Sequence, residues 1–155
     1  MKKNIALVTG GYSGESVISY KTADTIKQNL DPDKWNCFVI DINPEGWYYI
    51  NNDGTKSAVD KNDFSIIVNN TKINFDAVLV GLHGTPGEDG KLQGYFDCLK
   101  IPYTSCDAAT SALTFNKRYT VAVAAFAGMH VAKSLHLFKN IPVTVDAILK
   151  ELQLP

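Results

Sequence analysis

Hydrophobic residues in the first third of the chain occur first as a continuous run and then at helical spacing. Residues 5–9 form an apolar run that ends in Gly10 and Gly11, a pattern typical of a strand covered on both faces. In residues 16–30 apolar side chains recur every three or four positions, which predicts an amphipathic helix, and residues 37–42 form a second apolar run. The order strand, glycine turn, helix, strand predicts a parallel unit with a right-handed crossover.

The next stretch contains shorter runs. Residues 47–50 and 65–68 are rich in aromatic or β-branched side chains, and turn dipeptides follow them at 53–54 and 69–70. Short runs of this kind, bounded by turn residues, predict a small hairpin insertion on the surface of the domain.

A second strand, loop and helix occupy the middle of the chain. Residues 77–82 form an apolar run that leads directly into a glycine-rich loop at 83–90. In residues 92–99 apolar side chains fall at i, i+3, i+4 and i+7, so one helical face is expected to pack on the sheet. A short strand is expected at 101–104, with Pro102 placing it at an edge or a strand start. The predicted fold class is α/β, a three-layer Rossmann-like parallel sheet with flanking helices.

The last third is mainly helical in pattern, and capping residues bound the expected elements. These elements are a short helix from Asp107 to 115, a helix at 117–127 ended by Gly128, a strand at 130–135 and a helix at 145–152 capped by Thr144.

Composition and net charge limit the kinds of molecule that this chain is expected to bind. The chain has 155 residues, and 45% of them are hydrophobic, which is enough to form a hydrophobic core without stabilisation by a metal ion or disulfide bonds. Fifteen basic and sixteen acidic residues leave a formal charge of -1, so neither nucleic acid nor an anionic membrane is an expected partner.

The apolar run at 5–9 is too short for a signal peptide or a membrane span. Cys37, Cys98 and Cys106 have no C-x-x-C spacing and are expected to be reduced thiols packed as small hydrophobes, which suits the cytoplasm.

Glu15 is the first candidate for chemistry. The turn Gly-Gly-Tyr-Ser-Gly-Glu at 10–15 is neither a dinucleotide fingerprint nor a P-loop, because its glycine spacing differs and no Gly-Lys-Ser/Thr follows. A carboxylate at the start of a helix repels phosphate and is itself stabilised by the helix dipole, so this site suits an ammonium ligand. The alternative is that Glu15 is only a helix-terminal acid and Ser13 only the N-cap.

His83 is the second candidate, because it ends a buried strand at the edge where ligands bind in open parallel sheets. The alternative is a histidine satisfied by backbone. Glu88 can be explained by helix capping alone. Lys117 begins a helix, where a cation is mildly unfavourable, which points to an anionic partner, although a solvated lysine also fits. His130 and His136 are assigned to structure, and none of the histidines has a partner at zinc-ligand spacing.

Two segments resemble a known family. Residues 83–94, His-Gly-Thr-Pro-Gly-Glu-Asp-Gly-Lys-Leu-Gln-Gly, match at every fixed position the signature His-Gly-x-x-Gly-Glu-Asp-Gly-x-x-Gln-Gly of D-alanine:D-alanine ligases. The turn at 10–15 followed by Ser19 resembles the Gly-Gly-x-Ser-x-Glu-x-x-x-Ser segment of the same family. Residues 101–104 and 109–117 resemble its Pro-Tyr-Thr and Ala-Ser-Ala...Asp-Lys segments. The family's Asp before that lysine is Asn116 here, and its glycine after Tyr-Thr is Ser105.

The resemblance implies an ATP-grasp enzyme that uses ATP and Mg²⁺ to join two D-alanines for peptidoglycan, and a homodimer. It implies that Glu15 binds the ammonium of the first D-alanine and that Ser19 supports this loop. It further implies that His83 lies beside the carboxyl group of that substrate, that Glu88 braces the loop and that Lys117 faces nucleotide phosphates. Glu15 and His83 are thus the catalytic candidates, and no residue of this chain is a metal candidate.

The resemblance also implies two domains, an N-terminal pre-ATP-grasp domain at 1–136 and the start of a central ATP-grasp domain at 137–155. Most of the groups that hold ATP and Mg²⁺ would lie outside this chain, so the chain alone is expected to be inactive. Two alternatives stay open. One is a D-alanine:D-lactate or D-alanine:D-serine ligase, and the other is a Rossmann-like binding module without catalysis.

Overall fold

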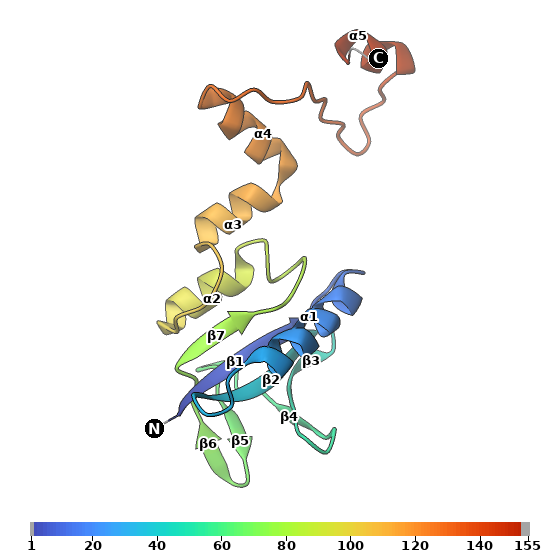
Figure 1. Ribbon diagram of the computed structural model, residues 1–155. Helices are drawn as coiled ribbons and strands as arrows, with labels where there is room; N and C mark the ends of the chain where they lie inside the picture. Colours follow the sequence, from blue (N-terminus) through green and yellow to red (C-terminus); the bar gives the residue numbers. More distant parts are fainter. Residues whose placement is uncertain (1, 153–155) are drawn as a thin grey trace. The chain divides into compact units, whose positions relative to one another are not determined.

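A computed structural model describes residues 2–152 and shows an α/β architecture (Figure 1). The chain divides into two compact units, Met1–Phe115 and Asn116–Pro155. In the first unit the elements are β1 (Lys3–Gly10), α1 (Ser16–Asn29), β2 (Trp35–Asn43), β3 (Gly46–Ile50), β4 (Lys56–Ala58), β5 (Ile66–Val68), β6 (Thr71–Ile73), β7 (Ala77–Val80), α2 (Lys91–Leu99) and α3 (Ala108–Phe115). The second contains α4 (Lys117–Phe126) and α5 (Val145–Glu151).

The main sheet has five strands in the order β4-β3-β2-β1-β7. β1 pairs in parallel with both β2 and β7, and Val78 of β7 forms a further parallel bridge with Tyr103. β3 and β4 are antiparallel, so the sheet is mixed. The predicted α/β class, its parallel centre and the short edge segment near Tyr103 are confirmed.

Helices cover both faces of this sheet, which confirms the three layers. On one face α1 packs with its buried Ala23 inward, and the Ile26 and Leu7 side chains meet beside Gly81. On the other face Leu92 and Phe96 of α2 belong to the same core cluster as the inner residues of β1 and β7. In α2 the helical spacing of the apolar residues explains the buried stripe. In α1 the helix is confirmed, but its buried residues are Ser19 and Ala23, whereas Val17 and Tyr20 of the expected apolar stripe are 58% and 41% exposed.

The aromatic core contains the segments that were expected to form a surface hairpin. Hairpins do form, β3 with β4 and β5 with β6, but β3 and β4 extend the main sheet. Phe64 is fully buried, and its ring lies 4.9 Å from that of Phe96 and 6.1 Å from that of Trp47. The surface placement was therefore wrong: Tyr49 and Ile66 in these segments are buried in the same core cluster as Phe64, because their side chains have enough apolar area to complete the core.

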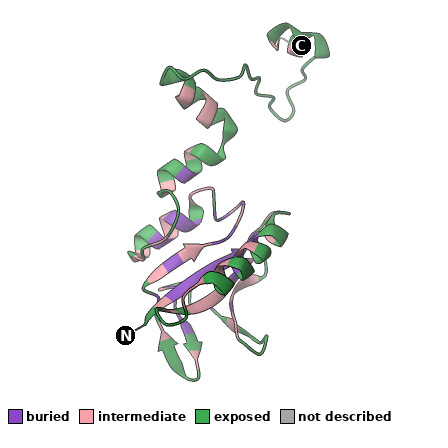
Figure 2. Ribbon diagram, viewed as in Figure 1, coloured by how far each residue is buried: buried purple, intermediate pink, exposed green. Residues whose placement is uncertain are grey.

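The second unit is less buried than the first (Figure 2). α4 begins after Asn116, whose side chain accepts hydrogen bonds from two helical N–H groups, and Thr144 caps α5 by accepting from the Ala147 N–H. Both helices were expected. The strand expected at 130–135 is wrong: these residues are exposed and unpaired with any strand of the described chain. Alternation alone cannot make a strand without a neighbouring backbone to accept its hydrogen bonds.

All three cysteines are free thiols. Cys37 is half-buried, and this burial raises the pKa of its thiol above the ordinary value. Cys98 and Cys106 are exposed, so the expectation that all three pack as small hydrophobes holds only for Cys37. Within residues 2–152 no helix has the length and apolar character needed to cross a membrane.

Candidate functional site

Two loops meet at the carboxyl ends of the parallel strands. The glycine turn connects β1 to α1, and the loop that begins at His83, the histidine loop, connects β7 to α2. The Tyr12 N–H donates to the Thr85 carbonyl at 2.8 Å, and the Gly11 N–H donates to the Ile42 carbonyl at 2.7 Å. Gly10 and Gly11 have φ angles of 91° and 118°, a conformation that favours glycine. The turn is thus joined by backbone hydrogen bonds to the histidine loop and to the end of β2.

Glu15 is the N-cap residue of α1 and has no side-chain capping hydrogen bond of its own. Its Oε2 accepts a hydrogen bond from the Ser13 hydroxyl at 3.3 Å, and Ser13 Oγ in turn accepts from the Glu15 N–H. The carboxylate is exposed and lies against Gly84 of the histidine loop, where an added Cβ would be 2.4 Å from Oε2. An exposed carboxylate, hydrogen-bonded to Ser13, therefore lies at the junction of the two loops.

His83 is held from three sides. Its backbone N–H donates to Oγ of the buried Ser19 at 2.8 Å. In the imidazole ring, Nε2 lies 3.0 Å from the Thr22 hydroxyl and Nδ1 lies 3.6 Å from Glu88 Oε1. The side chain is 39% exposed, so the ring is oriented by α1 and by its own loop while one part stays open to a ligand.

Glu88 does not cap the following helix. Its Oε2 accepts from the Gly84 N–H at 2.9 Å, and its Oε1 faces the His83 ring. Helix α2 instead begins after Gly90 without a side-chain cap. The capping alternative for Glu88 is therefore replaced by bonds within the histidine loop itself.

Two further polar side chains, those of Gln93 and Asp89, form hydrogen bonds with residues of the histidine loop. Gln93 is fully buried and donates from Nε2 to the Gly87 carbonyl at 2.6 Å. Asp89 accepts hydrogen bonds from Thr85 and Lys91. Burial acts to raise the pKa of Asp89, but these hydrogen bonds outweigh it and lower the pKa below the ordinary value. The side chains of Gln93 and Asp89 thus add hydrogen bonds that hold the histidine loop in its conformation.

A cavity of about 230 Å³ lies beside the His83 ring. It is lined by the side chains or backbone of Thr22, Val80, Gly81, Leu82, His83, Gly87, Glu88, Thr104 and Ser105. Glu15 is not in this lining, although its carboxylate adjoins the same loop at Gly84. The structure thus brings His83, Glu88 and Ser19 together directly, and places Glu15 at the neighbouring end of the loop.

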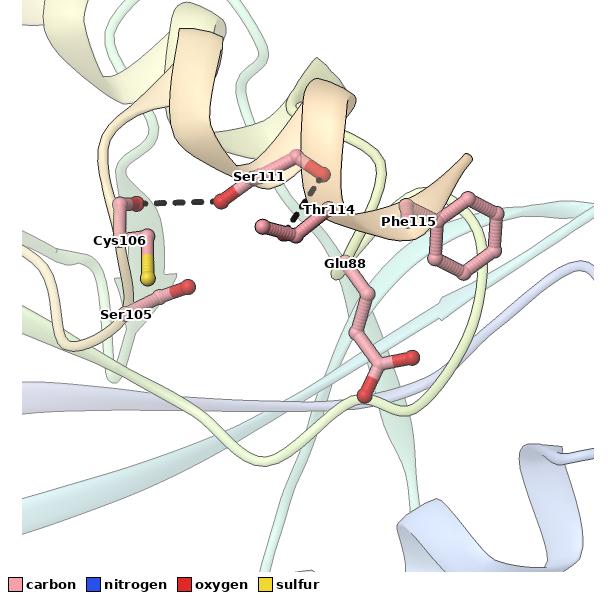
Figure 3. Close-up of a pocket in the computed structure, with 6 residues that line it drawn as sticks. All are labelled: Glu88, Ser105, Cys106, Ser111, Thr114 and Phe115. Carbon is pink, nitrogen blue, oxygen red and sulfur yellow. Dashed lines mark hydrogen bonds between the residues drawn. The ribbon is translucent and has the colours of Figure 1, made fainter. Parts of the chain in front are cut away.

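Figure 3 shows a second cavity, of about 280 Å³, under α3. Glu88 and Ser105 line both cavities. The Ser111 hydroxyl donates to the Cys106 carbonyl at 3.2 Å in this second cavity. Its lining includes no histidine, so the cavity beside His83 is the better candidate for binding and proton chemistry.

Lys117 is the fifth candidate residue. It is exposed and is the first residue of α4 in the second unit. The helix is capped by Asn116, which serves as well as the aspartate usual in the family because both side chains offer an oxygen to the free N–H groups.

A magnesium site does not fit the described part of the chain. Mg²⁺ prefers several oxygen ligands, including carboxylates. Residues 2–152 contain no cluster of three His, Cys, Asp or Glu side chains that could hold a metal ion.

Thr22 was missed in the sequence, although a signal for it was present. Glu15, Ser19 and Thr22 stand at i, i+4 and i+7 along the opening helix, which places three polar side chains on one face. An amphipathic helix normally turns its apolar stripe toward the sheet. A polar stripe that begins at the carboxyl end of the first strand therefore indicates a site.

Comparisons with known proteins agree on one family. The family model described as "D-ala D-ala ligase N-terminus" matches residues 4–106. A relative from Parabacteroides distasonis, D-alanine--D-alanine ligase, is 45% identical over 155 residues, which is 100% of this chain and 47% of that protein. This chain therefore spans about half the length of that relative.

Solved structures with the same fold include D-alanyl-alanine synthetase A from Vibrio cholerae, with a TM-score of 0.80 and 29% identity over 91% of this chain and 42% of the other. VanG D-Ala:D-Ser ligase from Enterococcus faecalis has a TM-score of 0.74 and 28% identity, covering 86% and 43% of the two chains. The match of the family model to most of the first unit, with the glycine turn and the histidine loop inside it, shows that this chain belongs to the D-alanine–D-alanine ligase family and corresponds to its N-terminal part.

Proposed function

We propose that this chain is the N-terminal, substrate-binding part of a longer enzyme that joins two D-alanines to D-alanyl-D-alanine, with hydrolysis of ATP to ADP and phosphate, for peptidoglycan synthesis. The observation that carries the proposal is the junction of the two loops, where the exposed Glu15 carboxylate adjoins the loop that holds His83. An amino acid has one positive and one negative group, and the Glu15 carboxylate is a suitable partner for the positive one, with the His83 ring in the adjoining loop. The 45% identity to a named ligase supports the same assignment.

In this proposal Glu15 binds the ammonium group of the first D-alanine. The carboxylate is free of capping bonds and lies at the start of α1. It can therefore accept charge-assisted hydrogen bonds, which are stronger than neutral ones.

His83 is proposed to lie beside the carboxyl group of the same substrate and to help hold it. Ser19 accepts a hydrogen bond from the backbone of His83, and Glu88 accepts one from the Gly84 N–H and lies beside the His83 ring. Ser19 and Glu88 thereby maintain the geometry of the site.

Lys117 is proposed to pair with the phosphates of ATP, because the lysine ammonium group is a compact positive charge on a flexible side chain. ATP, when bound, supplies the phosphoryl group that activates the substrate carboxyl. The remaining contacts to nucleotide and metal are proposed to come from outside this chain. A homodimer and a cytoplasmic location are parts of the same proposal, the latter in keeping with the three free thiols.

The charge of Glu15 can be tested in the longer protein. Glu15→Gln keeps the shape of the side chain and removes its charge, so the KM for the first D-alanine should rise by an amount equivalent to about 1.5–3 kcal/mol. Asp24→Asn is the matched control, because it removes one charge from the exposed side of the same helix. An unchanged KM and turnover in Glu15→Gln would exclude this role.

A D-alanine:D-serine ligase is a second candidate, since a solved relative of that kind shares the fold at 28% identity. Product analysis with D-alanine, D-serine and D-lactate as competing second substrates separates these activities. We expect D-alanyl-D-alanine as the main product. A protein that releases phosphate with none of these pairs would instead support a binding module.

A further inference from the structure

The two nitrogens of the His83 ring have partners on different elements. Nε2 lies 3.0 Å from Thr22 Oγ1 on α1, and Nδ1 lies 3.6 Å from Glu88 Oε1 in the histidine loop. Thr22 is 61 positions away from His83 in the chain, so this contact exists only because α1 packs beside the loop. Ser19, one turn earlier on the same helix, holds the backbone of His83.

Thr22 is unusual among the threonines of its helix. A helical threonine commonly turns its hydroxyl back to the carbonyl four residues earlier. Thr25, on the exposed side of α1, does this and donates to the Lys21 carbonyl at 3.1 Å. The Thr22 hydroxyl is directed instead at a half-exposed imidazole in a cavity.

The two neighbours of the ring favour one of its neutral forms. A neutral imidazole has one N–H donor and one acceptor nitrogen, and the neighbours decide which is which. The Glu88 carboxylate can only accept, so it favours the proton on Nδ1. Nε2 is then an acceptor, and the Thr22 hydroxyl supplies the donor.

The hydroxyl also fits the protonated ring. When both ring nitrogens carry hydrogen, Nε2–H can donate to Thr22 Oγ1, because a hydroxyl rotates to become an acceptor. Neither valine nor alanine can serve either state. The contact can therefore persist while the charge on the ring changes next to a substrate carboxyl group.

We propose that Thr22 is a positioning residue, whose hydroxyl fixes the orientation and the Nδ1–H tautomer of His83 in the 230 Å³ cavity. The expected effect of Thr22 on ligation rests on the proposed function, whereas its expected effect on the orientation and tautomer of the His83 ring does not. Thr22 acts through His83.

The test uses the longer protein labelled with ¹⁵N-histidine, in which the His83 signals are identified by their loss in His83→Asn. Three variants are compared with the parent protein: Thr22→Val, which keeps the branched shape without a hydroxyl, Thr22→Ser, which keeps the hydroxyl, and the control Thr25→Val. We expect the Nδ1–H tautomer in the parent, Thr22→Ser and Thr25→Val proteins. Thr22→Val should show an increased share of the Nε2–H tautomer.

Kinetics provide the second measurement. Thr22→Val should lower kcat/KM for D-alanine about threefold to tenfold, as for the loss of one neutral hydrogen bond, and leave the KM for ATP unchanged. Thr22→Ser should recover most of this loss, which a purely structural role of the threonine methyl group would not allow.

Two results would overturn the proposal: an unchanged tautomer in Thr22→Val, or the same changes in Thr25→Val. The absence of any ligase activity in the parent protein would count against the proposed function alone. The tautomer measurement would still decide the role of Thr22.

Discussion

The carboxylate of Glu15 lies so close to Gly84 that a Cβ on Gly84 would come within 2.4 Å of its Oε2 atom. Gly84 also has a φ of 73°, a conformation that side chains other than glycine rarely adopt. The Gly84 N–H donates to the Glu88 carboxylate, which lies beside the His83 ring. Gly84 therefore lies next to both Glu88 and the Glu15 carboxylate at the start of α1. Glycine at this position is therefore needed for both the turn and the neighbouring carboxylate.

Gly84→Ala should displace the Glu15 carboxylate, because the end of that side chain can move more easily than the backbone. Gly54→Ala is a matched control: Gly54 has a similar φ of 83° but open space around its Cβ position. Both variants should lose about 1 kcal/mol of stability through backbone strain. Only Gly84→Ala should raise the KM for the first D-alanine in the longer protein. Equal KM values in the two variants would contradict the close contact.

Phe64→Ala should lower the free energy of unfolding of the 155-residue chain by about 3–5 kcal/mol, since it empties the centre of the aromatic core. Phe64 is fully buried against Trp47, Phe75 and Phe96. Ile67→Ala, in the nearby hairpin at a side chain that is 55% exposed, should change the stability far less. Denaturant titration of both variants measures the difference, and a similar small loss in both would show that the core is elsewhere.

Tyr95 should make the chain less stable in alkali. Burial, and then the charges of Asp63 and Asp60, raise the pKa of Tyr95 to about 12 in the folded chain, from an ordinary value of 10. The unfolded chain loses this proton first, so the stability contributed by the neutral phenol is complete below pH 10 and declines as pH rises toward 12. Tyr95→Phe should reduce the slope of stability against pH in this window, and Tyr119→Phe, at an exposed tyrosine, is the control. Equal slopes in the parent and Tyr95→Phe chains would refute the shift.

The 155-residue chain alone should make no D-alanyl-D-alanine. Phosphoryl transfer needs cationic groups and a metal to neutralise charge on the transferred group, and this chain spans only 47% of the length of a named ligase of the family. The measurement is ATP-dependent release of phosphate with D-alanine, with the longer protein as the positive control. Release of phosphate by the chain alone would overturn this expectation.

Local patterns were sufficient for the helices and for the placement of the candidate residues. The helices expected at 16–30, 92–99 and 117–127 and the caps expected at Asp107 and Thr144 correspond to structure, because helical hydrogen bonds form between residues close in sequence. The meeting of the glycine turn with the histidine loop also followed from the sequence, since parallel strands bring their carboxyl ends to one edge.

Sheet partners and side-chain pairs across the fold were decided only by the tertiary structure. Residues 46–50 joined the main sheet and 130–135 formed no strand, although both had strand-like patterns, because a strand depends on a neighbour that its own residues do not specify. The bond between Thr22 and His83 is of the same kind. Sequence thus determined which side chains could form the site, and the packing of α1 against the histidine loop determined which atoms meet, since such contacts depend on the three-dimensional approach of distant segments.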